Sequence, residues 1–479
     1  MDNAGASYGD DSPIAAFATA PSGGALSLIR CSGKGAPELA ASVFSAPEKL
    51  KNAQGNTVVH GWIVATQGQE TGQRKIDEVL VSVFRAPKSY TGEDSLDISC
   101  HGGGAAGKGV MTALRAAGFR DALPGEYTFR AFMNGKLDLT RCESVLELVS
   151  AKTDKARAHA VGRLSGVLED EINAVKQMLV KILCGVEIFL DYSDDEVSAD
   201  EDEIAGRFPG QQLAREVLVR LRQLAQSWRR ERIYQEGILT VIAGRPNAGK
   251  SSLFNLLLKE ERSIVTEIPG TTRDWIEAWV SIEGIPIRLA DTAGLRESLD
   301  PVEKIGVERS RDLLETADVV LYLIDGGVGL TDEDRAFIAG NRPPSKQLLI
   351  IWNKSDIAPP PLTFPAAAKS PIGVSAKTGG GMAELTQAIA EAAGAQTGTT
   401  ATTIVGNDSA ALGSQRQKNL VDAAIAALEE ALNLAEREEA LDLIAPLLRE
   451  AVNSLGEITG EVSTDDILEE MFSKFCVGK

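Results

Sequence analysis

Eight residues have the types and the spacing of a loop that binds phosphate groups. Gly244, Gly249, Lys250 and Ser251 fit the pattern Gly-x-x-x-x-Gly-Lys-Ser. In such a loop the backbone N–H groups surround the phosphates, the lysine reaches the terminal phosphates and the serine hydroxyl binds Mg²⁺. The pattern predicts a site for a nucleoside phosphate with Mg²⁺. The alternative is a chance glycine-rich turn between a strand and a helix.

A second run, Asp-Thr-Ala-Gly at 291–294, follows the apolar segment 285–290. An aspartate at the carboxyl end of a strand can complete the magnesium shell, and the Gly294 N–H can reach a terminal phosphate. Thr271 and Thr272 lie between the two runs. A threonine there can close a loop over Mg²⁺ and the γ-phosphate, although Thr271 alone could belong to a polar surface turn.

The run Asn-Lys-Ser-Asp at 353–356 follows another apolar segment and predicts which base is bound. The Asp356 carboxylate can accept two hydrogen bonds from N1 and N2 of guanine, and adenine has no matching pair of donors. Ser375, Ala376 and Lys377 follow a short apolar run and can support the base. Because the motifs occur in this order, the sequence predicts a guanine-nucleotide domain.

The sequence departs from Ras-type enzymes where water is activated. Those enzymes place a glutamine after the Asp-x-x-Gly run, and this chain has Leu295. A carboxylate must then orient the water, and three lie nearby, namely Glu297, Asp300 and Glu303. Each of them could instead be an ordinary solvated residue of a loop.

The elements around these motifs predict three kinds of segment. From residue 238 to about 394, buried strands alternate with helices, including a strand at 239–243 and a helix at 251–258, which is typical of a doubly wound, mostly parallel sheet. Residues 14–138 have a mixed α/β pattern. The expected strands there are 24–30, 56–65, 77–84 and 95–100. Residues 108–119 then have helical spacing, with Gly118 where the C-cap of the helix belongs.

Long helical patterns flank the α/β segment on both sides. Residues 137–235 are helix-periodic apart from the acidic stretch 191–203, which is interpreted as a solvated loop, and helix returns from 410 after a predicted linker at 394–403. This order predicts one helical domain with the nucleotide domain inserted in it. The expected boundaries are 1–138 for the N-terminal domain, 139–237 and 398–479 for the helical domain, and 238–397 for the insertion.

Composition narrows the class of protein. The chain has 479 residues, a formal net charge of −19 and five scattered cysteines without a Cys-x-x-Cys pair. Such an acidic chain needs a local basic patch or a partner to bind RNA. The cysteine pattern argues against disulfides and structural zinc. The first residues do not resemble a signal peptide, and no apolar run is long enough to span a membrane, so a cytoplasmic location is expected.

Five segments beside the phosphate loop and the Asp-Thr-Ala-Gly and Asn-Lys-Ser-Asp runs resemble one family. They are residues 124–139 (PGEYTFRAFMNGKLDL), 90–94 together with 101–103, residues 270–274 (GTTRD), and the terminal Phe-Cys-Val-Gly-Lys at 475–479. Together they make the chain similar, over essentially its whole length, to the MnmE (TrmE) family of tRNA-modification GTPases. The domain order of that family agrees with the boundaries above, with a folate-binding type of N-terminal domain.

The resemblance implies partners and cofactors. Members of the family act with a flavin-dependent partner, MnmG (also called GidA), to add an aminomethyl or carboxymethylaminomethyl group to C5 of the wobble uridine of certain tRNAs. A reduced folate (5-formyl- or 5,10-methylene-tetrahydrofolate) is implied as the carbon donor. The resemblance also implies a homodimer whose G domains meet around GTP, Mg²⁺ and K⁺, and a heterotetramer with MnmG.

The resemblance also assigns roles to residues. Potassium is expected at Asn247, Thr266, Ile268 and Thr271, and magnesium at Ser251 and Thr272. Glu303 is expected to position water, with Lys250 and Cys476 as further catalytic residues, although Cys476 could also be a buried, inert thiol. Folate is expected at Arg30, Asp97, Lys136 and Lys479. The complete expected nucleotide site consists of Asn247, Ala248, Gly249, Lys250, Ser251, Ser252, Thr266, Glu267, Ile268, Pro269, Gly270, Thr271, Thr272, Asp291, Thr292, Ala293, Gly294, Asn353, Lys354, Asp356, Ser375, Ala376 and Lys377.

Two other functions remain open at the level of sequence. One is a GTP-dependent switch in ribosome assembly without modification chemistry, and such switches usually carry RNA-binding modules in place of a folate-type domain. The other is a folate-dependent aminomethyltransferase that works alone, for which a G domain would be unnecessary.

Overall fold

The fold is described from a computed structural model. The structure describes residues 7–20, 24–65, 74–191, 208, 210–260, 277–291, 313–340, 347–361, 364, 370–397, 410–463 and 465–478. The chain forms two compact units, one made of residues 1–142 with 453–479 and the other of residues 143–452. No helix in the described ranges is both long enough and apolar enough to cross a membrane.

The first unit contains a six-stranded sheet in the order β3-β4-β5-β2-β1-β6. Its strands are β1 (Ile14–Phe17), β2 (Leu26–Ser32), β3 (Thr57–Ala65), β4 (Arg74–Phe84), β5 (Ser95–His101) and β6 (Arg120–Asp121). All neighbours pair antiparallel except β1 and β6. The predicted strands of this segment are therefore present, with ends shifted by a few residues.

The connections β2–β3 and β5–β6 of this sheet contain helices, and two more helices of the unit come after β6 in the chain. They are α1 (Ala36–Ala41), α2 (Pro47–Lys51), α3 (Gly104–Ala117), α4 (Glu126–Met133) and, from the C-terminal part, α15 (Asp465–Ser473). As predicted, α3 ends at Gly118, whose φ of 112° suits a residue without a Cβ. The main core lies between the sheet and α3, where Ile29, Val81 and Ile98 are fully or almost fully buried.

The C-terminal residues pack within the same unit as the N-terminal sheet. Phe472 on α15 lies edge-on to Phe129 of α4, with ring centroids 5.4 Å apart. Beyond α15, Val477 forms a bridge with Pro124, and Gly125 N–H donates to the Cys476 carbonyl (3.3 Å). The predicted domain boundaries placed residues 453–479 with the helical domain, whereas their contacts group them with residues 1–142.

The second unit contains the predicted nucleotide-binding sheet, in the order β12-β11-β10-β7-β9-β8. Its strands are β7 (Ile238–Gly244), β8 (Glu277–Ile282), β9 (Ile285–Asp291), β10 (Val319–Asp325), β11 (Gln347–Asn353) and β12 (Ile372–Val374). Every neighbouring pair is parallel except β8 with β9. Parallel neighbours need crossover connections, and α9 (Lys250–Glu260) and α11 (Asp332–Gly340) lie in two of them, whereas α12 (Met382–Thr397) follows the last strand.

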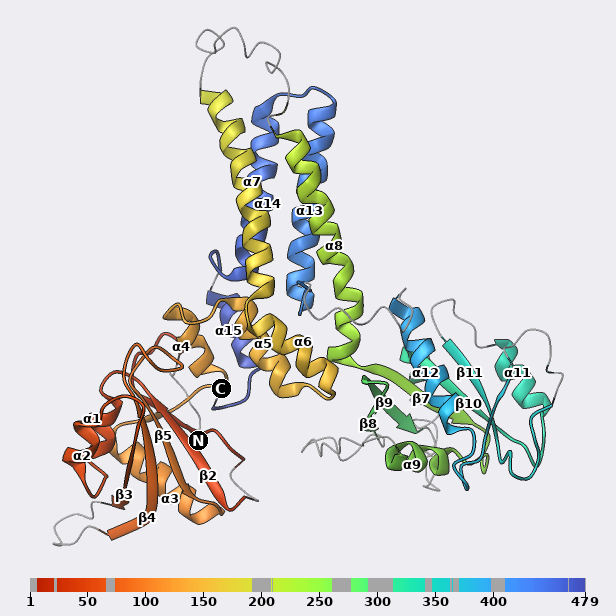
Figure 1. The fold of residues 1–479 in the computed structure, drawn as a ribbon, viewed down its shortest axis with the longest axis horizontal. Coiled ribbons are helices and arrows are strands. Elements are labelled where there is room, and N and C mark those ends of the chain that lie inside the picture. The colour runs from red at the N-terminus through yellow and green to blue at the C-terminus, as the bar shows by residue number, and fades with distance from the viewer. Residues whose placement is uncertain are drawn as a thin grey trace, which may run out of the picture. The chain divides into compact units, whose positions relative to one another are not determined.

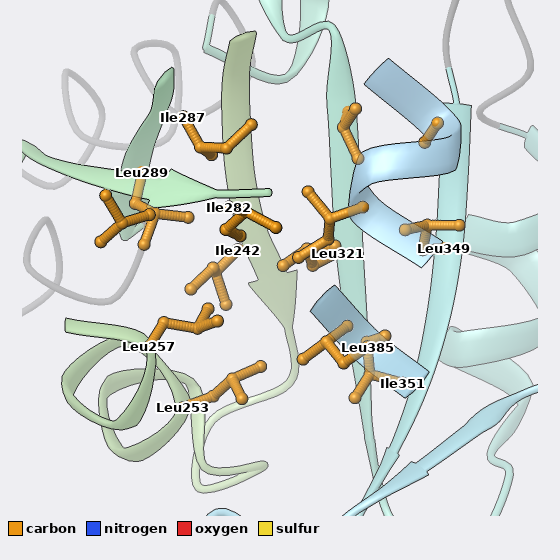
Figure 2. Packing of buried hydrophobic residues seen from close by; sticks show 14 of the residues in the cluster. Ile242, Leu253, Leu257, Ile282, Ile287, Leu289, Leu321, Leu349, Ile351 and Leu385 are labelled. Atoms are coloured by element: carbon orange, nitrogen blue, oxygen red, sulfur yellow. The ribbon is translucent and has the colours of Figure 1, made fainter. Parts of the chain in front are cut away.

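Both faces of this sheet are buried, as a doubly wound fold requires. On one face, Leu253 and Leu257 of α9 and Leu385 of α12 pack against Ile242 and Leu321 of the strands (Figure 2). On the other face, Ile338 of α11 belongs to a separate cluster. The structure thus confirms the predicted fold class.

The predicted linker at 394–403 begins too early. Helix α12 continues to Thr397, and residues 398–403 lie outside the described ranges. The physical reason is local, because Ala392, Ala393 and Ala395 are strong helix formers that carry the helix through Gly394.

Helices on both sides of the sheet form the rest of the second unit. They are α5 (Leu139–Ser150), α6 (Asp154–Leu164), α7 (Val167–Asp191), α8 (Gln211–Glu236), α13 (Gln415–Glu436) and α14 (Leu441–Thr459), whose last residues belong to the first unit. Figure 1 shows α7, α8 and α13 running side by side, and α8 contacts both of the others. The helices before and after the sheet are therefore packed together, with the sheet between them in the chain.

Candidate functional site

The phosphate loop connects the end of β7 to the start of α9. Gly244 has a φ of 138°, and a Cβ there would lie 2.5 Å from the Leu323 carbonyl of β10. Gly249 has a φ of 97°, and a Cβ there would collide with the Asn353 amide. Both glycines are thus required by the backbone itself. Between them, Asn247 adopts a φ of 63° and its side chain is exposed at the loop.

Lys250 and Ser251 lie at the first turn of α9. The Lys250 ammonium bends back over the loop and donates to the carbonyls of Gly244 (3.1 Å) and Arg245 (2.9 Å). The Ser251 hydroxyl donates to Asp291 Oδ2 at the end of β9 (3.0 Å). A hydroxyl and a carboxylate oxygen converging from two elements are the hard oxygen donors that Mg²⁺ prefers, so these residues fit the expected ion.

Asn353 lies at the end of β11 and joins the other side of the site to the phosphate loop. Its Nδ2 donates to the Ala248 carbonyl (2.7 Å), and its Oδ1 accepts from the Ala376 N–H (3.1 Å). The side chain is 2% exposed. The amide therefore joins the phosphate loop, the end of β11 and the loop after β12.

The predicted guanine contact is positioned by a serine. The Ser375 hydroxyl donates to Asp356 Oδ1 (2.7 Å) and accepts from the Thr378 N–H (3.2 Å). Asp356 itself is exposed, so its carboxylate can meet the N1 and N2 donors of a guanine ring. The serine fixes the carboxylate against rotation.

A residue that the sequence reasoning missed, Asp325, holds Lys354. Lys354 has a φ of 62°, and its ammonium pairs with Asp325 Oδ2 at the end of β10 (2.6 Å). Partial burial opposes ionisation of Asp325, but hydrogen bonds from Lys354 and the Gly327 N–H outweigh it and lower the pKa of the carboxyl. An aspartate directly after a buried strand was the available signal.

Several predicted nucleotide and metal residues lie outside the described ranges. They are Thr266, Glu267, Ile268, Pro269, Gly270, Thr271, Thr272, Thr292, Ala293, Gly294 and Glu303. Ser252 is exposed on the first turn of α9. Lys377 is exposed and follows Ala376 in the loop after β12.

A second candidate site lies on the sheet of the first unit. Arg30 on β2 and Asp97 on β5 are cross-strand partners, and their side chains form an ion pair of 3.0 Å. Burial opposes the charge on Arg30, but the hydrogen bond and ion pair with Asp97 raise the pKa of the guanidinium above its ordinary value. The structure thus brings two of the four predicted folate residues together.

Two tyrosines that were not predicted as folate residues flank the Arg30 guanidinium. Its central carbon lies 5.8 Å from the Tyr90 ring centroid and 6.0 Å from that of Tyr127. Burial raises the pKa of the Tyr127 phenol well above its ordinary value, so the hydroxyl remains a donor, and it binds the Arg30 carbonyl (2.7 Å). Both tyrosines lie in segments that carry the family resemblance, which was the available signal.

The other predicted site residues of this unit are Lys136, Cys476 and Lys479, and none of them belongs to the Arg30–Asp97 ion pair. Lys136 is exposed and donates to the Pro87 carbonyl (3.1 Å). The Cys476 thiol is exposed, which removes the alternative of a buried, inert cysteine, while its backbone is held by Gly125. Gly478 lies against the backbone of Phe17 on β1, and β1 pairs with β2, the strand that carries Arg30. Lys479 is outside the described residues.

The parallel sheet, the glycine-constrained phosphate loop and the Asn353–Asp356 loop define a P-loop GTPase, which binds GTP with Mg²⁺. Two family models match further parts of the chain. One, described as the MnmE helical domain, covers residues 139–476, and the other, described as the GTP-binding protein TrmE N-terminus, covers residues 13–136. The chain belongs to the MnmE family of tRNA modification GTPases.

Similar proteins cover the whole chain. It is 42% identical over 484 aligned positions to the tRNA modification GTPase MnmE of Treponema denticola, covering 99% of both chains. The MnmE of Carboxydothermus hydrogenoformans is 40% identical, covering 97% of this chain and 99% of that one. Among solved structures, Era bound to MgGDPNP and a ribosomal RNA segment aligns to 32% of this chain and 55% of that chain, at 29% identity and a TM-score of 0.25.

The carboxylate at position 356 gives the first prediction. Asp356→Asn removes the negative charge and replaces one of the two acceptor oxygens for guanine N1 and N2 with an NH2 donor. A hydrogen bond to a charged group contributes about 1.5–3 kcal/mol, so GTP affinity should fall about ten- to a hundredfold. Titration calorimetry with GTP measures the loss. Asp332→Asn, on an exposed carboxylate of α11 in the same domain, is the matched control and should bind as the wild type does. Unchanged GTP affinity in Asp356→Asn would refute the role of Asp356.

Proposed function

We propose that this chain is a potassium-dependent GTP hydrolase that acts with the flavin-dependent partner MnmG on certain tRNAs. The product is a carboxymethylaminomethyl or aminomethyl group on C5 of the wobble uridine. The observation that carries the proposal is the presence of two differently built sites in one chain of this family. One is the nucleotide site around Asn353, and the other is the Arg30–Asp97 site of the N-terminal unit.

The nucleotide site supports the hydrolytic half of the proposal. Lys250 can turn from the loop carbonyls to the terminal phosphates, since both it and the phosphates lie over the same loop. Ser251 and Asp291 would hold Mg²⁺, with Thr272 as a further proposed ligand. The Asn353 side chain supports the site by joining the phosphate loop to the loop after β12.

Potassium is proposed for the phosphate end of the site. The exposed Asn247, inside the phosphate loop, presents an amide that can coordinate a cation. Thr266, Ile268 and Thr271 are the other proposed ligands. Bound there, K⁺ supplies positive charge near the β- and γ-phosphates, where many GTPases use an arginine. Because Leu295 cannot orient water, Glu303 is proposed to do so, directly or through a second water.

The N-terminal site supports a reduced folate as the carbon donor. Folate combines a polar pterin ring with glutamate carboxylates, and a guanidinium flanked by two aromatic rings can pair with such a ligand. Asp97 can accept hydrogen bonds from pterin N–H groups. Lys136 and Lys479 are proposed to bind the carboxylates, and the exposed Cys476 thiol is proposed as a catalytic group near the folate.

Assembly completes the proposal. A homodimer would bring two G domains together around the nucleotides, and two such chains with two MnmG chains would form a heterotetramer. With a net charge of −19, this chain is an unfavourable general RNA binder, so docking of the tRNA through MnmG or a local basic patch agrees with its electrostatics.

Nucleoside analysis of a deletion strain tests the proposed function. Loss of the chain should remove the C5 modification from wobble uridines, and the wild-type chain should restore it. Lys250→Ala and Arg30→Ala should each fail to restore it, because each removes the cation of one site. Arg115→Ala, on an exposed pair with Asp121 in the N-terminal unit, is the control for Arg30 and should restore the modification.

Two results would count against the proposal. Normal wobble uridines in the deletion strain would refute the function as a whole. Full restoration by a folded Arg30→Ala chain would remove the folate role of Arg30 while leaving the GTPase half in place.

The cation and the water-positioning carboxylate give a separate prediction. GTP turnover should be fast in KCl and slow in NaCl at equal ionic strength, because the smaller Na⁺ fits the proposed shell poorly. Glu303→Ala should reduce turnover by at least about a hundredfold without weakening GTP binding, since Glu303 would act only on the attacking water. Glu384→Ala, on the exposed face of α12, is the control variant. Equal rates in the two salts, or near-normal turnover in Glu303→Ala, would contradict the respective half.

A further inference from the structure

The hairpin of β8 and β9 ends at Asp291, one of the residues proposed to hold Mg²⁺. β9 ends at Asp291, which accepts the Ser251 hydrogen bond (3.0 Å). From Ile287 to Asp291 it pairs in parallel with β7, the strand that leads into the phosphate loop. β8 pairs with β9 along its whole length, from Glu277 to Ile282. A continuous hydrogen-bonded ladder therefore connects Asp291 to the far end of the hairpin.

That far end contacts helix α6. The turn consists of Glu283 and Gly284, with φ of 53° and 79°, as a two-residue hairpin turn requires. The Lys155 ammonium donates to the Glu283 carbonyl (2.7 Å). A Cβ on Gly284 would lie 2.8 Å from both Cδ and Cε of Lys155. The lysine side chain therefore lies flat on the turn and also binds it.

The flank of the hairpin contacts the end of helix α8. Gly237, directly after α8, has a φ of 70°, and a Cβ there would collide with the Trp279 ring of β8 and lie 3.0 Å from the Pro286 carbonyl. Figure 1 shows the hairpin beside the ends of α6 and α8, and both helices contact β9. The hairpin is thus held against the helical segment at its tip and at its side.

Buried ion pairs connect α6 to its neighbours. Arg163 of α6 pairs with Glu147 of α5 (2.6 Å) and with Glu231 of α8 (2.7 Å). His159, one turn earlier on α6, binds the same Glu231 (2.9 Å). The Arg163 side chain is 6% exposed. Separating such a pair would leave a buried charge without a partner, which is costly. We therefore expect α5, α6 and α8 to move together when α6 is displaced.

We propose that the β8–β9 hairpin transmits the state of the bound nucleotide from Asp291 to the helical segment, with Lys155 as the positioning residue at the contact. The inference rests on the proposed GTP hydrolysis. Asp291 and Ser251 would hold a bound Mg²⁺, which would also contact the γ-phosphate of GTP, so loss of that phosphate would change the surroundings of Asp291 at the end of β9. The ladder moves the Glu283–Gly284 turn, and Lys155 passes that movement to α6.

Hydrogen exchange of the full-length chain tests the inference. In the wild type, backbone amides of α6 should exchange at different rates with GDP and with a non-hydrolysable GTP analogue. Lys155→Met keeps the methylene contact over Gly284 and removes the donor. The rate difference between the two nucleotide states should then fall about fivefold, as expected for one lost hydrogen bond. GTP affinity should stay within about twofold, because Lys155 does not face the nucleotide site.

Arg157→Met is the control, because Arg157 is exposed on the same helix and forms a local ion pair with Asp154, three residues earlier on α6. It should keep the full wild-type rate difference. A purely structural role of Lys155 would speed exchange equally in both nucleotide states and leave the difference unchanged, which would overturn the inference. A wild type with normal hydrolysis but identical α6 exchange in both states would also overturn it, while the proposed function stands. Absence of any GTP binding would instead remove the proposed function, and the inference with it.

Discussion

The nucleotide site depends on one buried amide. Asn353 donates to Ala248 in the phosphate loop and accepts from Ala376 in the loop after β12, so its two polar atoms connect three separate segments. Those segments meet because β7, β11 and β12 are parallel strands whose carboxyl ends lie at the same edge of the sheet. The sheet brings the loops near one another, and the amide fixes their relative positions. Because it is buried, each unmade hydrogen bond would cost about 1–3 kcal/mol.

In the N-terminal unit, helix α4 and the residue before it contact two predicted site residues. Tyr127 on α4 binds the backbone of Arg30, and the residue before α4, Gly125, binds the backbone of Cys476. Helix α4 thus holds both a predicted folate residue and the predicted catalytic cysteine, although they are far apart in sequence. Residues of the segment 124–139 thus contact both groups through their backbones.

Much of this could be predicted from sequence, because the signals are local. The phosphate loop follows a fixed spacing of glycines, lysine and serine, and the strands around it are continuous apolar runs. These gave the fold class and the location of Asn353 and Asp356. The strand ends were less well predicted, since they depend on pairing with neighbours.

The remaining features depend on contacts between distant residues, which spacing does not reveal. The ion pair of Asp325 with Lys354 joins the ends of two strands. The backbone bridge between Val477 and Pro124 joins the C-terminal residues to the segment before α4, and residues 453–479 group with residues 1–142. The contact of Lys155 with Glu283 joins a helix to a hairpin turn more than a hundred residues away. In each case the partner is chosen by the tertiary fold.

The most direct test of this account is nucleotide titration of Asn353→Asp beside the wild type. The variant keeps the size of the side chain and its acceptor, but it replaces the donor to Ala248 with a carboxylate oxygen facing a carbonyl. The account predicts that GTP and GDP affinities both fall by at least about tenfold, while the fold measured by circular dichroism is retained. Affinities within twofold of the wild type would contradict the claim that Asn353 organises the site.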